Sequence, residues 1–386
     1  MLSFDNTEVA FSGKTNSELK WAHRLFKLIG NNTLISLGKT FTNIALKLHL
    51  PISGIVKRTV FKQFCGGESI EECKDTINRL ADNNIGTILD YSVEAKSSDS
   101  DLEDTCLELE RGIKLAGKNI EIPFVVFKIS GIAPLAVLQE FNEKEAVNSK
   151  EYDKAYAKVD RLCKAAKEAN KPIFIDAEES WIQGTIDRIV EEMMQKYNKE
   201  KAVVYNTAQL YRWDRLDYIK NLYKKSKENG FEIGLKLVRG AYMEKERDRA
   251  KDNGYPSPIQ KDKEATDRDY DLALEFCVAN NIACCVGTHN EESSLLMTQL
   301  MEKAGAEKNN SLFYFSQLLG MSDHISFNLS NNGYNVAKYV PYGPVKEVIP
   351  YLIRRAEENT SVAGQTSREL SLISHEITRR SLLKQK

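Results

Sequence analysis

Eight short segments rich in β-branched residues alternate with helix-periodic segments, and this alternation predicts an α/β fold in which eight parallel strands close into a (βα)₈ TIM-type barrel. Several strand candidates are continuous apolar runs, which is typical of parallel strands covered on both faces. An open doubly wound sheet would also alternate, but no GxGxxG motif follows the first strand. The closed barrel is therefore the preferred architecture.

The elements can be placed in order along the chain. Strands are expected at 86–91, 122–129, 172–177, 202–206, 233–238, 282–287, 312–315 and 336–340. Amphipathic helices are expected at 69–83, 101–116, 151–169, 181–197, 214–228, 267–279, 291–304 and 344–359. The first of these helices precedes the first strand, and the others lie between or after the strands.

The segment before the barrel is basic. From Leu19 to Gly67 there is no Asp or Glu, while lysines and arginines are interleaved with apolar residues. This pattern predicts amphipathic helices with one basic edge, which either pack on the main domain or meet an anionic membrane surface. We expect the boundary at Gly66-Gly67, which gives an N-terminal arm of residues 1–67 and a barrel domain of residues 68–386 that ends in a C-terminal helix.

Composition excludes several classes of protein. Among the 386 residues, 42% are hydrophobic and 28% charged, as in an ordinary globular protein, and a net charge of -1 argues against a nucleic-acid partner. The seven cysteines have no zinc-ligand spacing, so no metal site and a reducing compartment are expected. Asp5 and Glu8 lie where a signal peptide or mitochondrial presequence would be basic, so neither is expected.

Polar residues follow the predicted strands at their C-terminal ends, where barrel enzymes carry their chemistry. They are Asp90 with Glu94, Lys128, Asp176, Asn206 with Gln209, Lys236 with the segment 239–242, the segment 288–290, and Tyr339. One polar strand end carries little information, because loops are polar. Lysine, aspartate, glutamine, arginine and histidine at successive strand ends indicate an active site.

The last predicted helix carries two adjacent arginines. Tyr351, Arg354, Arg355 and Glu358 share one face, opposite an apolar stripe with helical spacing. This face is either a solvated surface with an Arg354–Glu358 pair, or it overhangs the barrel mouth, because a tight loop joins it to Tyr339. Two guanidiniums suit bidentate binding of a carboxylate or phosphate.

Nine motifs between Leu89 and Asn359 resemble, in order, those of the proline dehydrogenase family. They are LDYSVE (89–94), FKIS (127–130), IDAEE (175–179), YNTAQLY (205–211), KLVRGAY (236–242), GTHN (287–290), LLGM (318–321), YVPYGP (339–344) and YLIRRAEEN (351–359). The resemblance implies a distorted (βα)₈ barrel that binds FAD and oxidises L-proline to 1-pyrroline-5-carboxylate, the first step of proline catabolism to glutamate. A quinone would then reoxidise the flavin.

The resemblance also implies roles for individual residues. Catalytic roles fall to Asp176, Lys236, Lys128 and Tyr242, with Asp176 organising the site through Lys128 and Tyr242. Substrate-binding roles fall to Lys128, Leu318, Tyr339, Tyr351, Arg354 and Arg355, and Glu94 would pair with Arg354 to gate the site. FAD-contacting roles fall to Ala177, Gln209, Val238, Arg239, Gly240, Ala241, Lys263, Thr288, His289 and Glu358.

Some positions depart from the family pattern, and alternatives remain. Lys236 stands where many members carry arginine, and Leu319 replaces a histidine of the bifunctional relatives. Hydroxyproline dehydrogenase is the closest alternative, but Tyr339 favours proline, because a smaller residue stands there in that branch. A non-catalytic, membrane-docked barrel is another. A bacterial cytoplasm with peripheral contact to the inner membrane is expected, or the mitochondrial matrix if the protein is eukaryotic.

Overall fold

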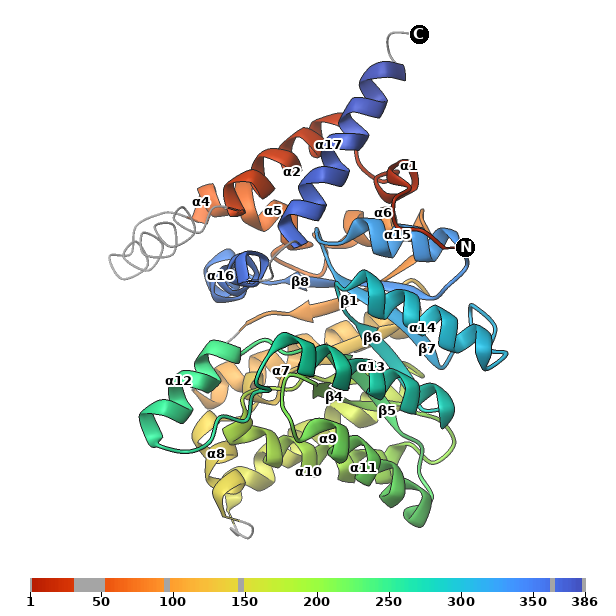
Figure 1. Ribbon diagram of the computed structural model, residues 1–386. Coiled ribbons are helices and arrows are strands. Elements are labelled where there is room, and N and C mark those ends of the chain that lie inside the picture. Colours follow the sequence, from red (N-terminus) through yellow and green to blue (C-terminus); the bar gives the residue numbers. More distant parts are fainter. Residues whose placement is uncertain (1, 31–52, 94–97, 145–148, 362–364, 384–386) are drawn as a thin grey trace.

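The computed structural model describes residues 2–30, 53–93, 98–144, 149–361 and 365–383, with the side chains of 355–361, 365 and 366 left out. Eight strands close into one barrel in the order β1 to β8, and every neighbouring pair is parallel, including β1 with β8 (Figure 1). The strands are β1 Ile85–Tyr91, β2 Phe124–Phe127, β3 Ile173–Ile175, β4 Val204–Gln209, β5 Gly234–Val238, β6 Ala283–Gly287, β7 Phe313–Leu318 and β8 Val336–Tyr342. The predicted barrel is confirmed.

Helices cover the outside of the barrel and one of its ends (Figure 1). Along the barrel they are α6 Lys74–Ala81, α7 Asp99–Lys118, α8 Leu135–Glu143, α9 Lys150–Glu168, α10 Ser180–Tyr197, α11 Arg215–Asn229, α12 Met243–Asn253, α13 Lys263–Ala279, α14 Glu291–Lys303, α15 Asp323–Asn331 and α16 Val345–Ser361. Before the barrel lie α1 Thr7–Ala10, α2 Asn16–Ile29, α4 Ser53–Val56, the π-helix Lys57–Phe61 and α5 Lys62–Phe64, and after it lies α17 Gln365–Leu383.

The barrel interior is filled from its N-terminal end by aromatic rings. Side chains alternate along each strand, so Phe124, Phe174 and Tyr205 point inward, and the rings of Phe124 and Phe174 stack with centroids 4.4 Å apart. Gly234 lies in register with Tyr205, whose ring occupies the space that a Cβ at Gly234 would need. The polar inward positions are thereby confined to the C-terminal end of the barrel.

Helices from both ends of the chain form a second apolar cluster beside the barrel. It joins α2, α5, α16 and α17, and includes Phe26 and Phe64, whose rings meet edge to face. Val348 and Leu352 of α16 are buried in the same cluster. The helix that carries the two arginines therefore packs on segments that lie before β1 and after β8 in sequence.

Part of the N-terminal arm can be compared with the expectation that it packs on the main domain. The helices α1 and α2 pack on α17, and α1 also packs on α15. Residues 31–52 of the basic arm lie outside the described residues. Gly67 bridges to Tyr342 of β8 at the predicted boundary, which stays a prediction. No helix in the described part of the chain is long and apolar enough to cross a membrane.

Candidate active site

Four inward-facing polar side chains meet at the C-terminal end of the barrel, centred on Asp176. The Lys236 ammonium pairs with Asp176 Oδ1, and the Tyr339 hydroxyl donates to Asp176 Oδ2 at 2.7 Å. Thr207 Oγ1 lies 3.5 Å from Asp176 Oδ1. Each residue stands two positions after another inward-facing position of its strand, as Asp176 does after Phe174, so strand alternation brings all four together.

The charges of this cluster are stabilised by one another. Burial alone would raise the pKa of Asp176, but the charges of Lys236 and Lys128 and the hydrogen bonds from Lys236 and Tyr339 lower it overall. Burial and the neighbouring carboxylates of Asp176 and Asp90 hold the pKa of Tyr339 well above its usual value. The cluster is therefore an ionised carboxylate that accepts from a protonated phenol and an ammonium. That ammonium also lies 4.8 Å from the centroid of the Tyr339 ring.

A second network crosslinks the ends of β3, β4 and β5. Gln209 Nε2 donates to the carbonyl of Glu178 at 2.8 Å, and Gln209 Oε1 accepts from the Ala241 amide at 3.2 Å. Gly240 adopts φ +140°, and its missing Cβ leaves room for the Tyr211 ring. We expected the absence of a side chain at Gly240 to let a cofactor approach. The structure shows that the Tyr211 ring also requires a glycine at this position. Ala177 is buried next to Asp176, and Val238 ends β5 in register with Gln209.

Arg239 forms the centre of a third network at the ends of β5 and β6. Its guanidinium donates to Asp267 at 2.7 Å, to Thr288 Oγ1 at 2.7 Å and to Ser293 Oγ at 3.0 Å. Lys263 pairs with the same Asp267 carboxylate from one turn earlier on α13. The predicted positions Arg239, Lys263 and Thr288 are thus brought together, although Arg239 and Lys263 are 24 positions apart in sequence.

His289 lies at the edge of this region. Its Nδ1 is 2.9 Å from the hydroxyl of Ser322, the residue that precedes α15. Tyr242 is half-buried immediately before α12, close enough to Tyr211 to influence the pKa of that phenol. Lys128 directly follows β2 and acts on Asp176 through its charge.

The predicted substrate residues lie around Tyr339. Leu318 ends β7 in register with Tyr339, and Tyr351 of α16 is buried and near enough to influence the pKa of Tyr339. Arg354 is half-buried on the same helix. The side chains of Arg355 and Glu358 lie outside the described part, as does all of Glu94. The binding of the substrate carboxylate by Arg354 and Arg355, and the pairing of Arg354 with Glu94, remain predictions.

Asp90 and Thr207 belong to the cluster although we assigned them no role from the sequence. Asp90 is 2% exposed, accepts from the Ser92 hydroxyl, and lies close enough to raise the pKa of Tyr339. The signal for Asp90 was its place at the end of the first strand. Thr207 carried no such signal, because a threonine within a strand is ordinary.

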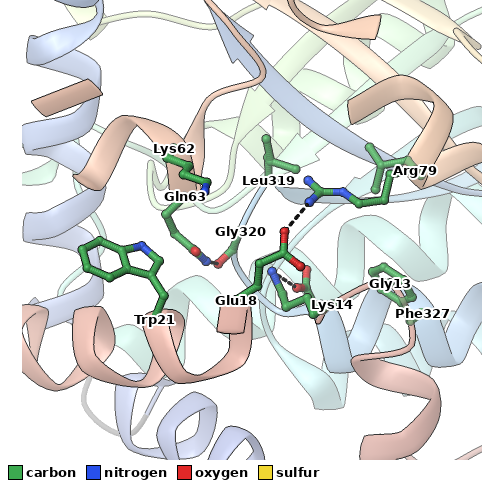
Figure 2. A pocket seen from close by; sticks show the side chains of 12 residues that line it. Gly13, Lys14, Glu18, Trp21, Lys62, Gln63, Arg79, Leu319, Gly320 and Phe327 are labelled. Atoms are coloured by element: carbon green, nitrogen blue, oxygen red, sulfur yellow. Dashed lines mark hydrogen bonds and ion pairs between the residues drawn. The ribbon is translucent and has the colours of Figure 1, made fainter. Parts of the chain in front are cut away.

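A cleft elsewhere on the surface has no predicted site residue in its lining (Figure 2). It lies between α2, α5, α6 and the start of α15. Glu18 and Arg79 approach to 3.5 Å across it, and Lys14 lies 3.2 Å from Asp323. These four charged groups are thus paired locally. The buried ionised cluster at the strand ends is the stronger candidate for catalysis.

A closed (βα)₈ barrel with a buried lysine–aspartate–tyrosine cluster at its strand ends has the architecture of a barrel enzyme. Residues 73–368 match the family model described as proline dehydrogenase. The chain belongs to the proline dehydrogenase family and is an oxidoreductase of the class that acts on CH–NH donors.

Curated relatives and a solved structure resemble this chain. "Proline dehydrogenase 1, mitochondrial" of Dictyostelium discoideum is 31% identical and covers 97% of this chain and 74% of that protein. "Carbapenem antibiotics biosynthesis protein CarD" of Pectobacterium carotovorum is 33% identical over 82% of this chain and 83% of its own length. The proline utilization A structure from Bdellovibrio bacteriovorus has a TM-score of 0.73 at 20% identity. It covers 92% of this chain, which spans 38% of that larger one, and it supports the fold alone.

Proposed function

We propose that the barrel oxidises L-proline to 1-pyrroline-5-carboxylate with FAD as its cofactor and a quinone as the final electron acceptor. The observation that carries this proposal is the buried cluster of Asp176, Lys236 and Tyr339 at the strand ends. The cluster holds the cation of Lys236 and the hydroxyl and ring of Tyr339 in fixed positions at the end of the barrel where barrel enzymes carry their active sites.

Binding of the substrate is assigned to α16 and to the residues around Tyr339. Arg354 and Arg355 hold the carboxylate, because guanidinium forks match its two oxygens. Tyr339, Tyr351 and Leu318 enclose the ring methylenes, and Lys128 lies beside them. A carboxylate held at one end and a ring confined at the other leave the substrate one orientation, which lowers the entropic part of the barrier. Glu94 competes for Arg354 and so gates the site.

The FAD-contacting residues fit a diphosphate-bearing cofactor. Arg239 and Lys263 share the carboxylate of Asp267, so two cations face one anion. Thr288 and His289 lie beside this group, and Gln209, Ala241 and Gly240 form a hydrogen-bonded edge next to it. Ala177, Val238 and Glu358 complete the set. When bound, FAD supplies the acceptor for the hydride that leaves the proline ring.

Lys236 and Asp176 have separate tasks. The Lys236 ammonium stabilises negative charge that develops beside it during the reaction. Asp176 has a lowered pKa and is therefore a weak base, so it orients Lys236 and Tyr339 instead of accepting the proton of the substrate amine. Tyr242 helps to order the loop after β5.

Proline is favoured over hydroxyproline by the position of Tyr339. Its hydroxyl is tied to Asp176 at 2.7 Å, so the ring cannot swing away to admit a substituent without breaking a buried hydrogen bond. The alternative of a non-catalytic barrel is disfavoured by the buried, ionised Lys236–Asp176 pair. Such a pair is costly to desolvate, and catalysis gives a reason for its presence.

Two further proposals concern the surroundings of the enzyme. The basic arm within residues 1–67 meets an anionic membrane, where a quinone is dissolved, and the barrel domain comprises residues 68–386. The compartment is the bacterial cytoplasm at the inner membrane, or the mitochondrial matrix.

The test is an anaerobic titration of the purified protein. We expect a yellow protein whose flavin absorption is bleached by L-proline and far less by hydroxyproline, and a pyrroline product after a quinone is added. A colourless protein, or a flavin that neither substrate bleaches, contradicts the proposal. Stronger bleaching by hydroxyproline would assign the protein to that substrate instead.

A further inference from the structure

We propose that Ser322, held by Glu369 of the C-terminal helix, is a positioning residue that fixes His289 in the tautomer with its proton on Nε2. The proposal rests on the proposed function, because His289 is assigned to FAD there. It adds a residue of the β7–α15 loop and one of α17 to the construction of the cofactor site.

The first observation is the backbone of Ser322. It adopts φ +50° and ψ +42°, the left-handed region that residues other than glycine rarely adopt. The other positive-φ residues besides glycine in the described part of the chain are Asn84, Asn170 and Asn281, and asparagine tolerates this region better than serine. A serine there indicates that the surrounding structure imposes the conformation.

The second observation is what holds this backbone. The Ser322 amide donates to the Glu369 carboxylate of α17, and both residues are buried. From the other side, the Lys338 ammonium of β8 donates to the carbonyl of Met321 at 2.5 Å and lies 2.9 Å from Asp323. The residues on both sides of Ser322 are thereby fixed to the barrel, and Ser322 itself to the C-terminal helix.

The third observation is the direction of the Ser322 hydroxyl. A serine at the first position before a helix ordinarily caps that helix with its side chain, yet Ser322 makes no such bond to α15. Its Oγ lies instead 2.9 Å from His289 Nδ1. The left-handed backbone thus directs the hydroxyl away from its own helix and toward the end of β6.

The tautomer follows from the proton of this hydroxyl. Ser322 is fully buried, so its O–H needs an acceptor, and within the part of the chain that the structure describes His289 Nδ1 is the acceptor in reach. A neutral imidazole that accepts at Nδ1 carries its proton at Nε2. The imidazole therefore presents a donor on the side opposite Ser322, which suits the acceptor oxygens of a dinucleotide.

The experiment compares Ser322→Gly with Ser330→Ala in the full-length protein. Glycine adopts the left-handed backbone without strain and removes the hydroxymethyl side chain of Ser322. Ser330 is the matched control, because it is also a buried serine of this segment, and its hydroxyl donates to the carbonyl of Asn83 at 2.7 Å, at the other end of α15. Two readouts are used: the tautomer of His289 in long-range ¹H–¹⁵N spectra, assigned with His289→Gln among the five histidines, and the Kd for FAD.

We expect the wild-type protein and Ser330→Ala to show His289 protonated at Nε2. Ser322→Gly should lose this signature and bind FAD about fivefold more weakly, as expected for one hydrogen bond. Glu369→Leu should produce the same change in the spectrum, whereas Glu369→Gln, which keeps an acceptor oxygen, should not.

Two results would overturn the inference: an unchanged His289 tautomer in Ser322→Gly, or a changed tautomer with an unchanged Kd for FAD. A wild-type chain that binds no flavin at all contradicts the proposed function instead, and the spectra then still decide whether Ser322 sets the tautomer.

Discussion

Asp176 and Lys236 illustrate how single residues in this barrel depend on their partners. Both are buried, and each stabilises the charge of the other against the cost of desolvation. Removing one partner leaves the other buried charge without its ion-pair partner, whereas replacing both with neutral residues removes both charges of the pair. The pair can therefore be tested by its effect on stability, independently of catalysis.

We expect Lys236→Met to lower the free energy of unfolding by about 3 kcal/mol, because the Asp176 carboxylate loses its strongest partner. The double variant Asp176→Asn/Lys236→Met should recover most of this loss. Urea unfolding at pH 7 measures both. Equal losses in the single and double variants would show that the methionine fits poorly and that the charge is not the cause.

Glu178 gives a pH dependence with a defined sign. Burial raises its pKa from 4.5 to about 7, against the opposing hydrogen bonds from Ser130. A carboxyl whose pKa is higher in the folded state binds a proton more tightly there, so its contribution to stability falls as pH rises from 4.5 through about 7.

At 1.36 kcal/mol per pKa unit, this loss amounts to about 3 kcal/mol. The difference in unfolding free energy between wild type and Glu178→Gln, measured from pH 4.5 to 8, should shift in favour of the variant by this amount. A pH-independent difference would place the folded-state pKa of Glu178 near its ordinary value.

At the scale of elements, the helix α16 depends on helices outside the barrel for its position. Val348 and Leu352 are buried in the cluster that also contains Phe26 and Phe64. The helix α16, which carries the arginines proposed to bind the substrate, thus packs on α2, α5 and α17. We expect its position to be sensitive to changes far from the strand ends.

Phe64→Ala should lower the free energy of unfolding by about 3–4 kcal/mol, because Phe64 is 1% exposed in this cluster. It should also raise the KM for proline while FAD is retained, since α16 shifts but the strand ends do not. Ile55→Ala, at a residue 69% exposed on the neighbouring α4, is the control and should change neither quantity. A variant with lowered stability and an unchanged KM would show that substrate binding does not depend on the packing of α16 in this cluster.

The sequence predicted all eight strands but, within the described part of the barrel, missed three helices, and the reasons are physical. Residues of α12 are almost all polar, so this helix shows no apolar stripe. In α15 the opposite holds, because Asp323–Ser330 are all buried and no face contrasts with another. The helix α8 has nine residues, too few for a clear period.

The site was predictable to the extent that strand alternation determines it. Asp176, Lys236 and Tyr339 could be assigned to the mouth from their strand positions alone. The Arg239–Asp267–Lys263 network could not, because it depends on how the loop after α12 returns to the barrel. Ser322 gave no signal either, since its role arises from a backbone conformation that α17 imposes.

At the scale of the whole molecule, the two ends of the chain are joined through α17. Arg380 donates to the carbonyls of Phe11 at 2.8 Å and Lys14 at 2.7 Å, and to Asn16 Oδ1 at 3.1 Å. It also pairs with the buried Glu376 one turn earlier. One guanidinium thus donates hydrogen bonds to acceptors of the segment where α1 ends and α2 begins. It thereby connects the N-terminal arm to the C-terminal helix.

Arg380→Ala should therefore lower the free energy of unfolding by about 2 kcal/mol, because two carbonyls and a carboxylate lose a charged donor together. Arg379→Ala is the matched control: the neighbouring arginine pairs with the same Glu376 and with an exposed Glu8, and its loss should cost less than about 1 kcal/mol. Urea unfolding measures both, and hydrogen exchange of residues 11–19 should accelerate in Arg380→Ala alone. Equal effects of the two variants would assign the stabilisation to Glu376, and the ends of the chain would then be joined by apolar packing without help from this guanidinium.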